Sequence, residues 1–133
     1  MKIIIVDDEK DMLNLLADIL RGEGYEIATA NNAPEFMKVA DEQTIPPNLV
    51  ITDLDMPALN GFGVIFQTRS RWGGEIPIIV VSAGLQDNKE RMNRCLQETS
   101  YIVHKGPDFN INDFKRIVGI AVANSGQKQA VPA

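Results

Sequence analysis

The sequence predicts an α/β protein, in which a five-stranded parallel sheet is covered by helices on both faces. Short apolar runs alternate five times with segments of helical periodicity. The runs are apolar at successive positions, which is typical of strands buried on both faces. The connections are short, as right-handed strand–helix–strand crossovers require. The 133 residues have the usual size of one domain, and we assign residues 1–124 to it and 125–133 to a polar tail or the start of a linker.

Each element has its own signal. The expected strands are residues 2–6, 25–30, 49–53, 76–81 and 101–104. The first helix carries apolar residues at i, i+3 and i+4 and ends at Gly22 and Gly24, and the second has Pro34 in its first turn. The third begins near Phe62 and ends near residues 71–74. The last two helices span residues 88–98 and 112–124, with Asn110 or Asn112 as the N-cap of the last one.

Composition excludes several classes of function. Hydrophobic residues make up 44% of the chain and charged residues 23%, as in ordinary globular proteins. The net charge of −5 argues against nucleic-acid binding, because phosphate backbones select basic surfaces. A single cysteine, Cys95, cannot form an internal disulfide, and the apolar run at residues 2–6 is too short for a signal peptide or a membrane span. We therefore expect a soluble cytoplasmic protein with neither nucleic-acid nor membrane partners.

Polar side chains stand where the predicted strands end. Asp7 and Asp8 follow the first strand, Asp53 ends the third, Ser82 follows the fourth and Lys105 the fifth. The carboxyl ends of parallel strands lie at one edge of the sheet, where open α/β sheets bind their ligands. We expect all five groups to converge in one crevice.

This set of groups suits phosphoryl transfer. Clustered carboxylates stay ionised only beside a cation, and an all-oxygen set favours Mg²⁺ over zinc. An ammonium and a hydroxyl can bind phosphoryl oxygens. Taken singly, Asp7 or Asp8 could cap a helix, Asp53 could cap a turn, Ser82 could be inert and Lys105 could be solvated. Their joint placement at four strand ends favours a site at which Asp53 accepts a phosphoryl group with metal assistance.

The same residues resemble the receiver domain of two-component response regulators, the family that includes the chemotaxis regulator. The resemblance covers about residues 2–124 and implies a flavodoxin-like doubly wound (βα)5 fold with strand order 2-1-3-4-5. The matching motifs are Ile4-Ile5-Val6-Asp7-Asp8-Glu9, Asp53-Leu54-Asp55-Met56-Pro57, Asn60-Gly61, Val80-Val81-Ser82-Ala83 and Lys105.

The resemblance implies a role for each matching residue. Asp53 would be phosphorylated by a sensor histidine kinase or a phosphotransfer protein. Asp8 and Asp53 would ligate Mg²⁺ by their side chains, Asp7 partly through water, and Asp55 through its backbone carbonyl. Asp55, like Gly84, also lies where the family tunes the lifetime of the phosphorylated state. Two further groups would act on the phosphoryl group, Lys105 by pairing with it and Ser82 as the switch hydroxyl.

The resemblance also implies a signalling module with weak self-catalysed phosphotransfer and autodephosphorylation, not a turnover enzyme. A downstream effector, or a second copy of the chain in a homodimer, would bind through the last helix and the fifth strand.

The last helix has one apolar stripe, and Ile120 lies on the opposite side, either as a lone exposed residue or as a partner contact. The stripe comprises Ile111, Phe114, Val118, Ala121 and Val122.

Two positions depart from the family pattern. The family usually has an aromatic residue three positions before the lysine, where this chain has Ile102. Tyr101 is one residue away and should point to the opposite face of the sheet. Gly106 separates Lys105 from Pro107, where the family has a Lys-Pro pair. The usual aromatic switch is therefore not expected in this chain.

Two other functions compete with this interpretation. A haloacid-dehalogenase-type phosphatase would use Asp53 as nucleophile and Asp55 as general acid, but that motif belongs on the first strand with the metal-binding acids after it. A receiver-like scaffold would bind partners without phosphorylation. The intact set of Asp53, Ser82 and Lys105 disfavours the scaffold, whereas the missing aromatic residue favours it.

Overall fold

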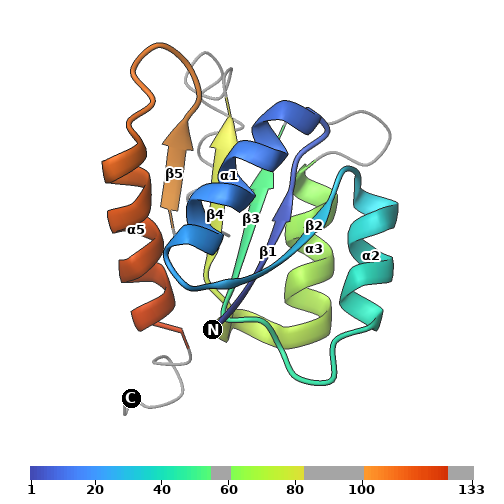
Figure 1. Ribbon diagram of the computed structural model, residues 1–133. Helices are drawn as coiled ribbons and strands as arrows, with labels where there is room; N and C mark the ends of the chain where they lie inside the picture. The colour runs from blue at the N-terminus through green and yellow to red at the C-terminus, as the bar shows by residue number, and fades with distance from the viewer. Residues whose placement is uncertain (55–60, 83–100, 126–133) are drawn as a thin grey trace.

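The computed structural model describes residues 1–54, 61–82 and 101–125. Their five strands form one sheet in the order β2-β1-β3-β4-β5, and every neighbouring pair is parallel. The predicted fold and strand order are thus confirmed (Figure 1). The strands are β1 Lys2–Val6, β2 Glu26–Ala30, β3 Leu49–Asp53, β4 Ile78–Ser82 and β5 Tyr101–His104.

Helices connect the strands and pack on both faces of the sheet. In the described residues these are α1 Lys10–Gly22, α2 Ala33–Asp41, α3 Gly61–Trp72, the short 3-10 helix η1 Gly73–Glu75 and α5 Ile111–Ala123. Asn32 caps α2, since its side chain accepts a hydrogen bond from the amide of Glu35 at 2.7 Å. Asn110 caps α5 in the same way, through the amide of Asp113 at 3.0 Å. Of the two predicted caps, Asn110 is therefore the correct one.

The sheet divides the core into two layers, because successive strand residues point to opposite faces. Ile4 and Val6 of β1 pack with α2 and α3, whereas Ile3 and Ile5 pack with α1 and α5. Every residue of β3 and β4 is buried. These strands are therefore rigid supports for whatever stands at their carboxyl ends.

Three predicted details were wrong. Tyr25 does not begin β2, because its amide bonds to the carbonyl of Leu20 at the end of α1. Residues 76 and 77 do not belong to β4, since Ile76 caps the 3-10 helix and Pro77 has no amide hydrogen. The last helix does not begin at residue 112, because Asn110 caps it and the 42% exposed Ile111 is its first residue.

The outer strand β5 is less buried than its neighbours, and its residues are half-buried or exposed. Ile102 packs with the α2 and α3 layer, and Tyr101 packs with the α1 and α5 layer. The prediction that these two side chains point to opposite faces is confirmed. The Tyr101 hydroxyl also accepts a hydrogen bond from the side chain of Asn124 at 3.4 Å.

Some predictions fall outside the described residues. They concern the helix at 88–98, Cys95, Asp55, Gly84 and residues 126–133 of the tail. The boundary between domain and tail stays a prediction. Among the described residues, no helix is long and apolar enough to cross a membrane.

Candidate functional site

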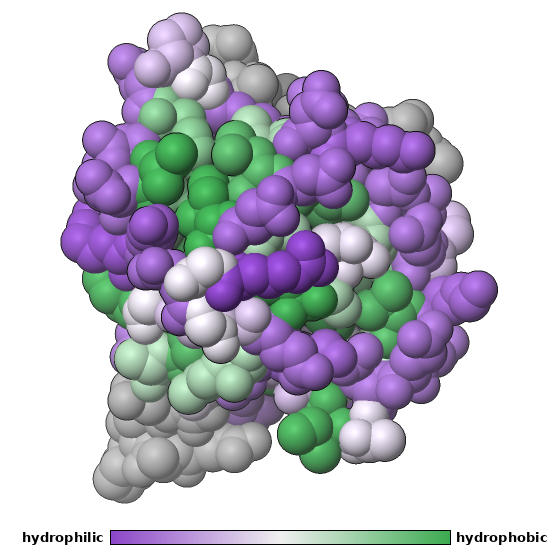
Figure 2. All heavy atoms as spheres, in the orientation of Figure 1, coloured by the Kyte–Doolittle hydropathy of each residue, from purple (hydrophilic) through white to green (hydrophobic). Residues whose placement is uncertain are grey.

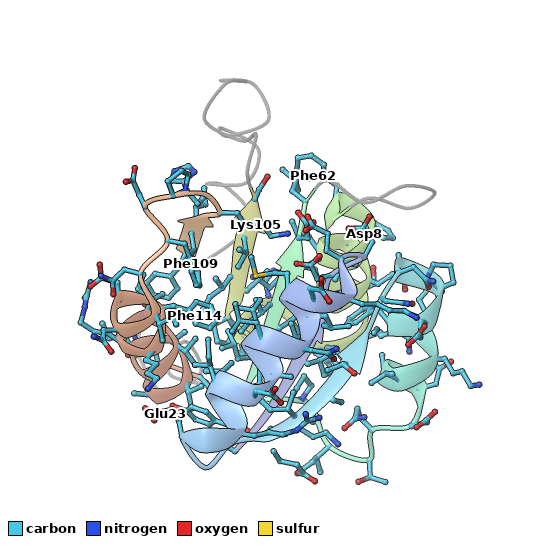
Figure 3. The ribbon with its side chains drawn as sticks, turned by 45° about the horizontal axis from the view of Figure 1, so that its top comes forward. Asp8, Glu23, Phe62, Lys105, Phe109 and Phe114 are labelled. Carbon is cyan, nitrogen blue, oxygen red and sulfur yellow. The ribbon has the colours of Figure 1, made fainter. Side chains whose placement is uncertain are left out.

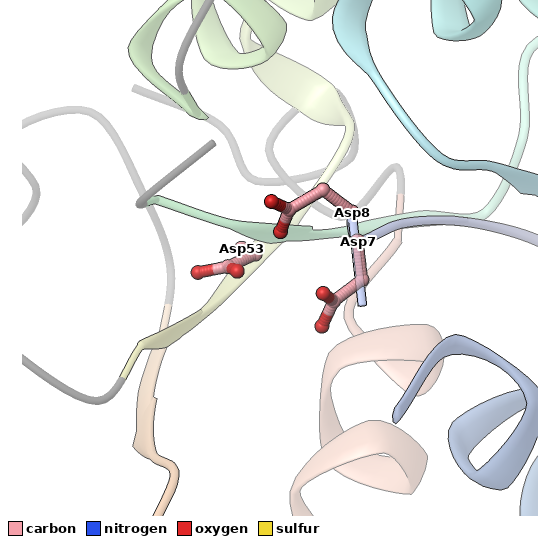
Figure 4. Close-up of side chains that lie close together, drawn as sticks. All are labelled: Asp7, Asp8 and Asp53. Atoms are coloured by element: carbon pink, nitrogen blue, oxygen red, sulfur yellow. The ribbon is translucent and has the colours of Figure 1, made fainter. Parts of the chain in front are cut away.

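Three carboxylates meet at the carboxyl edge of the sheet. Asp7 and Asp8 follow β1 and Asp53 ends β3, and one oxygen from each lies within 4.8 Å of the others (Figure 4). Asp7 and Asp53 are buried, whereas Asp8 is exposed at the mouth of the cluster. At this edge, two carboxylates are therefore shielded from water and the third is open to it.

Hydrogen bonds of both its backbone and its side chain fix the position of Asp7. Its amide donates to the carbonyl of Ala30 at 3.1 Å, which continues the β1–β2 ladder. Its carboxylate accepts a hydrogen bond from the amide of Glu9 at 2.9 Å, which turns the chain from β1 into α1. Glu9 is the N-cap residue of α1, but its side chain makes no capping bond. Of the two carboxylates predicted as possible caps, Asp7 is the one that accepts a backbone amide at the start of α1.

Lys105 enters this cluster from β5, and Figure 3 shows its side chain extending toward the edge where Asp8 lies. Its ammonium is 2.8 Å from a carboxylate oxygen of Asp7 and 3.0 Å from one of Asp53. A third oxygen, from Glu9, is 3.6 Å away. The Lys105 side chain is only 7% exposed, so these contacts replace most of its hydration.

Glu9 is a contact that sequence reasoning missed. We treated it as part of the acidic run, but its carboxylate approaches Lys105 from the exposed side of the site. Its place directly after Asp7 and Asp8 was the available signal. The side chain of Glu9 is 66% exposed, so solvent screens this pair strongly.

Burial and charge act against each other in the pKa values of the site. Burial raises the pKa of the Asp7 carboxyl, although the hydrogen bonds from Lys105 and from the Glu9 amide oppose this shift. Burial alone would lower the pKa of Lys105, but its contacts with Asp7 and Asp53 outweigh it and the pKa is raised. Lys105 therefore keeps its positive charge, and the carboxylates of Asp7, Asp53 and Glu9 surround this one ammonium.

Ser82 stands at the end of β4 and is fully buried. It continues the alternation of Ile78 and Val80, so it belongs to the α2 and α3 side of the sheet, where Ile102 also packs. The carbonyl of Ser82 accepts a hydrogen bond from the amide of Lys105 at 3.0 Å. The backbone of Ser82 is therefore joined directly to the residue that holds the carboxylates.

The structure brings together four of the predicted site residues: Asp7, Asp8, Asp53 and Lys105. Ser82 lies at the same edge of the sheet, and Asp55 is outside the described residues. Beyond Lys105, Gly106 has a φ of 145°, a backbone conformation that favours glycine. This turn directs the chain from the site to the start of α5.

Comparisons of the sequence with known proteins agree with this arrangement. The model of the response regulator receiver domain matches residues 3–111. The probable transcriptional regulator ycf27 of Pyropia yezoensis is 38% identical over 82 residues, which make up 62% of this chain and 32% of that protein. Transcriptional regulatory protein PrrA of Mycobacterium tuberculosis is 34% identical over 82 residues, or 62% of this chain and 34% of that protein. The chain thus spans about a third of the length of these relatives.

Solved structures extend the likeness to the whole fold. The response regulator protein TrrA from Thermotoga maritima, solved in complex with Mg²⁺-BeF, is 31% identical with a TM-score of 0.76, over 90% of this chain and 97% of that one. A CheY-like response regulator receiver domain protein from Methanospirillum hungatei has a TM-score of 0.83 over 96% of this chain and 97% of that one. At 22% identity this second likeness shows the fold alone. With the family model matched over residues 3–111, the chain belongs to the response regulator receiver domains of two-component signalling.

Proposed function

We propose that Asp53 accepts a phosphoryl group from a sensor histidine kinase or a phosphotransfer protein, with Mg²⁺ bound beside it. The observation that carries this proposal is the cluster of Asp7, Asp8 and Asp53, two of which contact the ammonium of Lys105. In the transfer, a carboxylate oxygen of Asp53 forms a bond to phosphorus while the bond from phosphorus to the donor nitrogen breaks. Mg²⁺ would screen the negative charge of both reactants.

The donor set fits the metal. Asp7, Asp8 and Asp53 all offer carboxylate oxygens, which Mg²⁺ prefers as ligands. Their negative charge exceeds the single positive charge of Lys105, and the excess attracts a divalent cation. Asp8 would supply an exposed ligand, Asp53 a buried one, Asp7 a group that acts partly through water, and Asp55 a backbone carbonyl. TrrA, the relative solved with Mg²⁺-BeF, supports this part of the proposal.

Lys105 and Ser82 would respond to the new charge on Asp53. Lys105 would exchange part of its contact with Asp7 and Asp53 for the phosphoryl oxygens, which attract an ammonium more strongly than a carboxylate does. Ser82 would donate its hydroxyl hydrogen to the same group. Because Ile102 shares the face of Ser82 in this chain, the signal would pass by repacking of an aliphatic side chain rather than by rotation of an aromatic ring.

The partners follow from where this chemistry lies. A phosphoryl donor must approach the carboxyl edge of the sheet, and Figure 2 shows apolar side chains gathered near it, over β5 and between α5 and α1. We place the output contact on β5 and α5, either with an effector or with a second copy of the chain.

The phosphoryl transfer belongs in the cytoplasm, since a chain with a single cysteine suits a reducing compartment. Slow self-catalysed loss of the phosphoryl group would end the signal.

Incubation with acetyl phosphate and Mg²⁺ tests the proposal. We expect an acid-stable, base-labile adduct in stoichiometric amount, mapped to Asp53 by mass spectrometry and absent from Asp53→Asn. Sustained hydrolysis of small phosphate esters would instead indicate a phosphatase. If neither an adduct nor hydrolysis occurs, the chain is a scaffold and the proposal is wrong.

A further inference from the structure

The outer edge of β5 carries backbone groups that face away from the sheet. The amide of Lys105 donates to the carbonyl of Ser82, so Lys105, Val103 and Tyr101 turn their backbone groups toward β4. In a parallel ladder the alternate residues turn theirs outward. The amides and carbonyls of Ile102 and His104 therefore point away from β4, and no backbone group of the described chain pairs with them.

A pocket of about 350 Å³ adjoins this edge. Its floor is apolar, with Phe114 and Ile117 of α5 beside Val103 on the same face of the sheet, so it can receive the apolar part of a side chain. Its rim is polar and is formed by the segment that joins β5 to α5 and by the first turns of α5. The rim residues include His104, Asp108 and Asp113.

Apart from Lys105, the charged side chains that line this pocket are carboxylates. Lys105 also lines it, but its ammonium is already held by the carboxylates of Asp7 and Asp53. Asp108 is exposed, and Asp113 meets only Arg116 of the described chain, at 3.9 Å between two well-exposed side chains. Such a pair is weak in water. An approaching group with a positive charge is therefore favoured at the rim.

We infer that the β5 edge and this pocket bind an extended segment of a basic partner protein. The segment would pair with the outward groups of Ile102 and His104 and would place an apolar side chain in the pocket, with a Lys or Arg next to it near Asp108 and Asp113. Because this is the surface proposed above for output, the assignment rests on that proposed function and names its partner. A second copy of the chain would bring the same two carboxylates to the contact, so charge favours a basic segment.

Peptide titrations followed by ¹H–¹⁵N NMR test the inference, because a four-residue edge gives weak and rapidly exchanging complexes. The probes are capped heptapeptides that alternate Val with Thr and carry Lys at one of the central positions. We expect saturable shifts at the amides of Ile102, His104 and Asp113. Peptides with Glu in place of Lys, or N-methylated where an amide must donate to β5, should not bind. N-methylation at the alternate positions should be tolerated.

Variants of the protein test the same contact from the other side. His104→Pro removes one outward amide and leaves the bond from Lys105 to Ser82 intact, and proline is tolerated at such an edge position. It should weaken peptide binding about three- to tenfold, whereas His104→Ala should not. Asp108→Asn combined with Asp113→Asn should weaken binding about two- to fivefold. The charge-matched control, Glu35→Gln on α2 with Glu42→Gln at its C-cap, should leave binding unchanged.

The outcomes separate this inference from the phosphoryl-transfer proposal, because the titrations contain neither Mg²⁺ nor acetyl phosphate. If the peptides bind but the separate incubation with acetyl phosphate gives no adduct on Asp53, the docking site stands and the receiver chemistry is wrong. If the adduct forms but no peptide binds, the receiver chemistry stands and the docking site is wrong. Failure of the whole lysine panel, or equal binding of the N-methylated pairs, overturns the inference. It is also overturned if His104→Pro abolishes self-association while no peptide binds, since the occupant is then a second copy. If His104→Pro does not fold, the N-methylated peptides decide.

Discussion

Lys105 is the residue on which the stability of the site depends. It is the cation that lies between the buried carboxylates of Asp7 and Asp53, and removal of one partner of a buried pair typically costs about 3–5 kcal/mol. Lys105→Met should therefore lower the free energy of unfolding by about that amount in metal-free buffer, and Mg²⁺ should restore more stability to it than to the wild type. Urea denaturation with and without Mg²⁺ measures both effects.

The same substitution at Lys115 is the matched control. Lys115 pairs with Glu23 at 3.7 Å, and the side chains are 35% and 43% exposed to solvent. Such pairs contribute about 0–1 kcal/mol, so Lys115→Met should change little and should not alter the response to Mg²⁺. Equal losses in the two variants would mean that Lys105 does not hold the carboxylates.

The raised pKa of Asp7 predicts how stability changes with pH. The folded state holds this proton more tightly than the unfolded state, so the contribution of Asp7 to stability is lost as pH rises through the raised pKa. Lys105 keeps its contact with Asp53, so Asp7→Asn leaves no unpaired buried charge and should raise the free energy of unfolding at pH 7 in metal-free buffer. This gain should shrink on acidification toward the ordinary carboxyl range. A variant that is less stable than the wild type at pH 7 would contradict the direction of the shift.

At the scale of single elements, α5 depends on its cap. The Asn110 side chain accepts the amide of Asp113, so Asn110→Ala should lower the free energy of unfolding by about 1 kcal/mol. Asn112 is equally suited by residue type but lies exposed inside the first turn. Thermal or urea unfolding of Asn112→Ala should show a change below about 0.5 kcal/mol. The reverse order would place the helix start two residues later.

Sequence reasoning succeeded for the elements wherever side-chain pattern alone decides. Continuous apolar runs located β3 and β4, and the alternation of faces correctly separated Tyr101 from Ile102. It failed at Tyr25, because a backbone bond to Leu20 keeps Tyr25 in the turn before β2 and no residue pattern reports such a bond. The contacts of Lys105 were also beyond it. Residue order places Lys105 and the carboxylates at the same edge of the sheet, but it does not give the distances of 2.8 and 3.0 Å that join Lys105 to Asp7 and Asp53.

At the scale of the whole molecule, metal binding and stability are linked. A ligand that binds only the folded state stabilises it by about 2.7 kcal/mol at a concentration one hundred times its dissociation constant. Mg²⁺ should thus raise the melting temperature of the wild type in calorimetry, whereas Asp8→Asn should respond less. Ca²⁺ at equal concentration controls for ionic strength and charge. A melting temperature that is independent of Mg²⁺ would remove the metal from the proposed function.

The output surface supplies the last prediction. Ile120 is 40% exposed on α5, away from the buried residues Phe114, Val118 and Ala121. Ile120→Glu should leave the melting temperature nearly unchanged but weaken binding of an effector or self-association. Sedimentation and pull-down with a candidate effector measure the two contacts. If both persist unchanged, Ile120 is a lone exposed residue.

The bond from Lys105 to Asp7 joins the last strand of the sheet to the first, across almost the whole sequence. Contacts of such long sequence separation form late in folding, because the intervening chain must be ordered first. During synthesis, Asp7, Asp8 and Asp53 emerge well before Lys105, so a nascent chain exposes its carboxylates without their cation. The charge cluster is complete only when the entire sheet has assembled. A fragment that ends before β5 would therefore lack the complete site, which keeps partly made copies out of the signal.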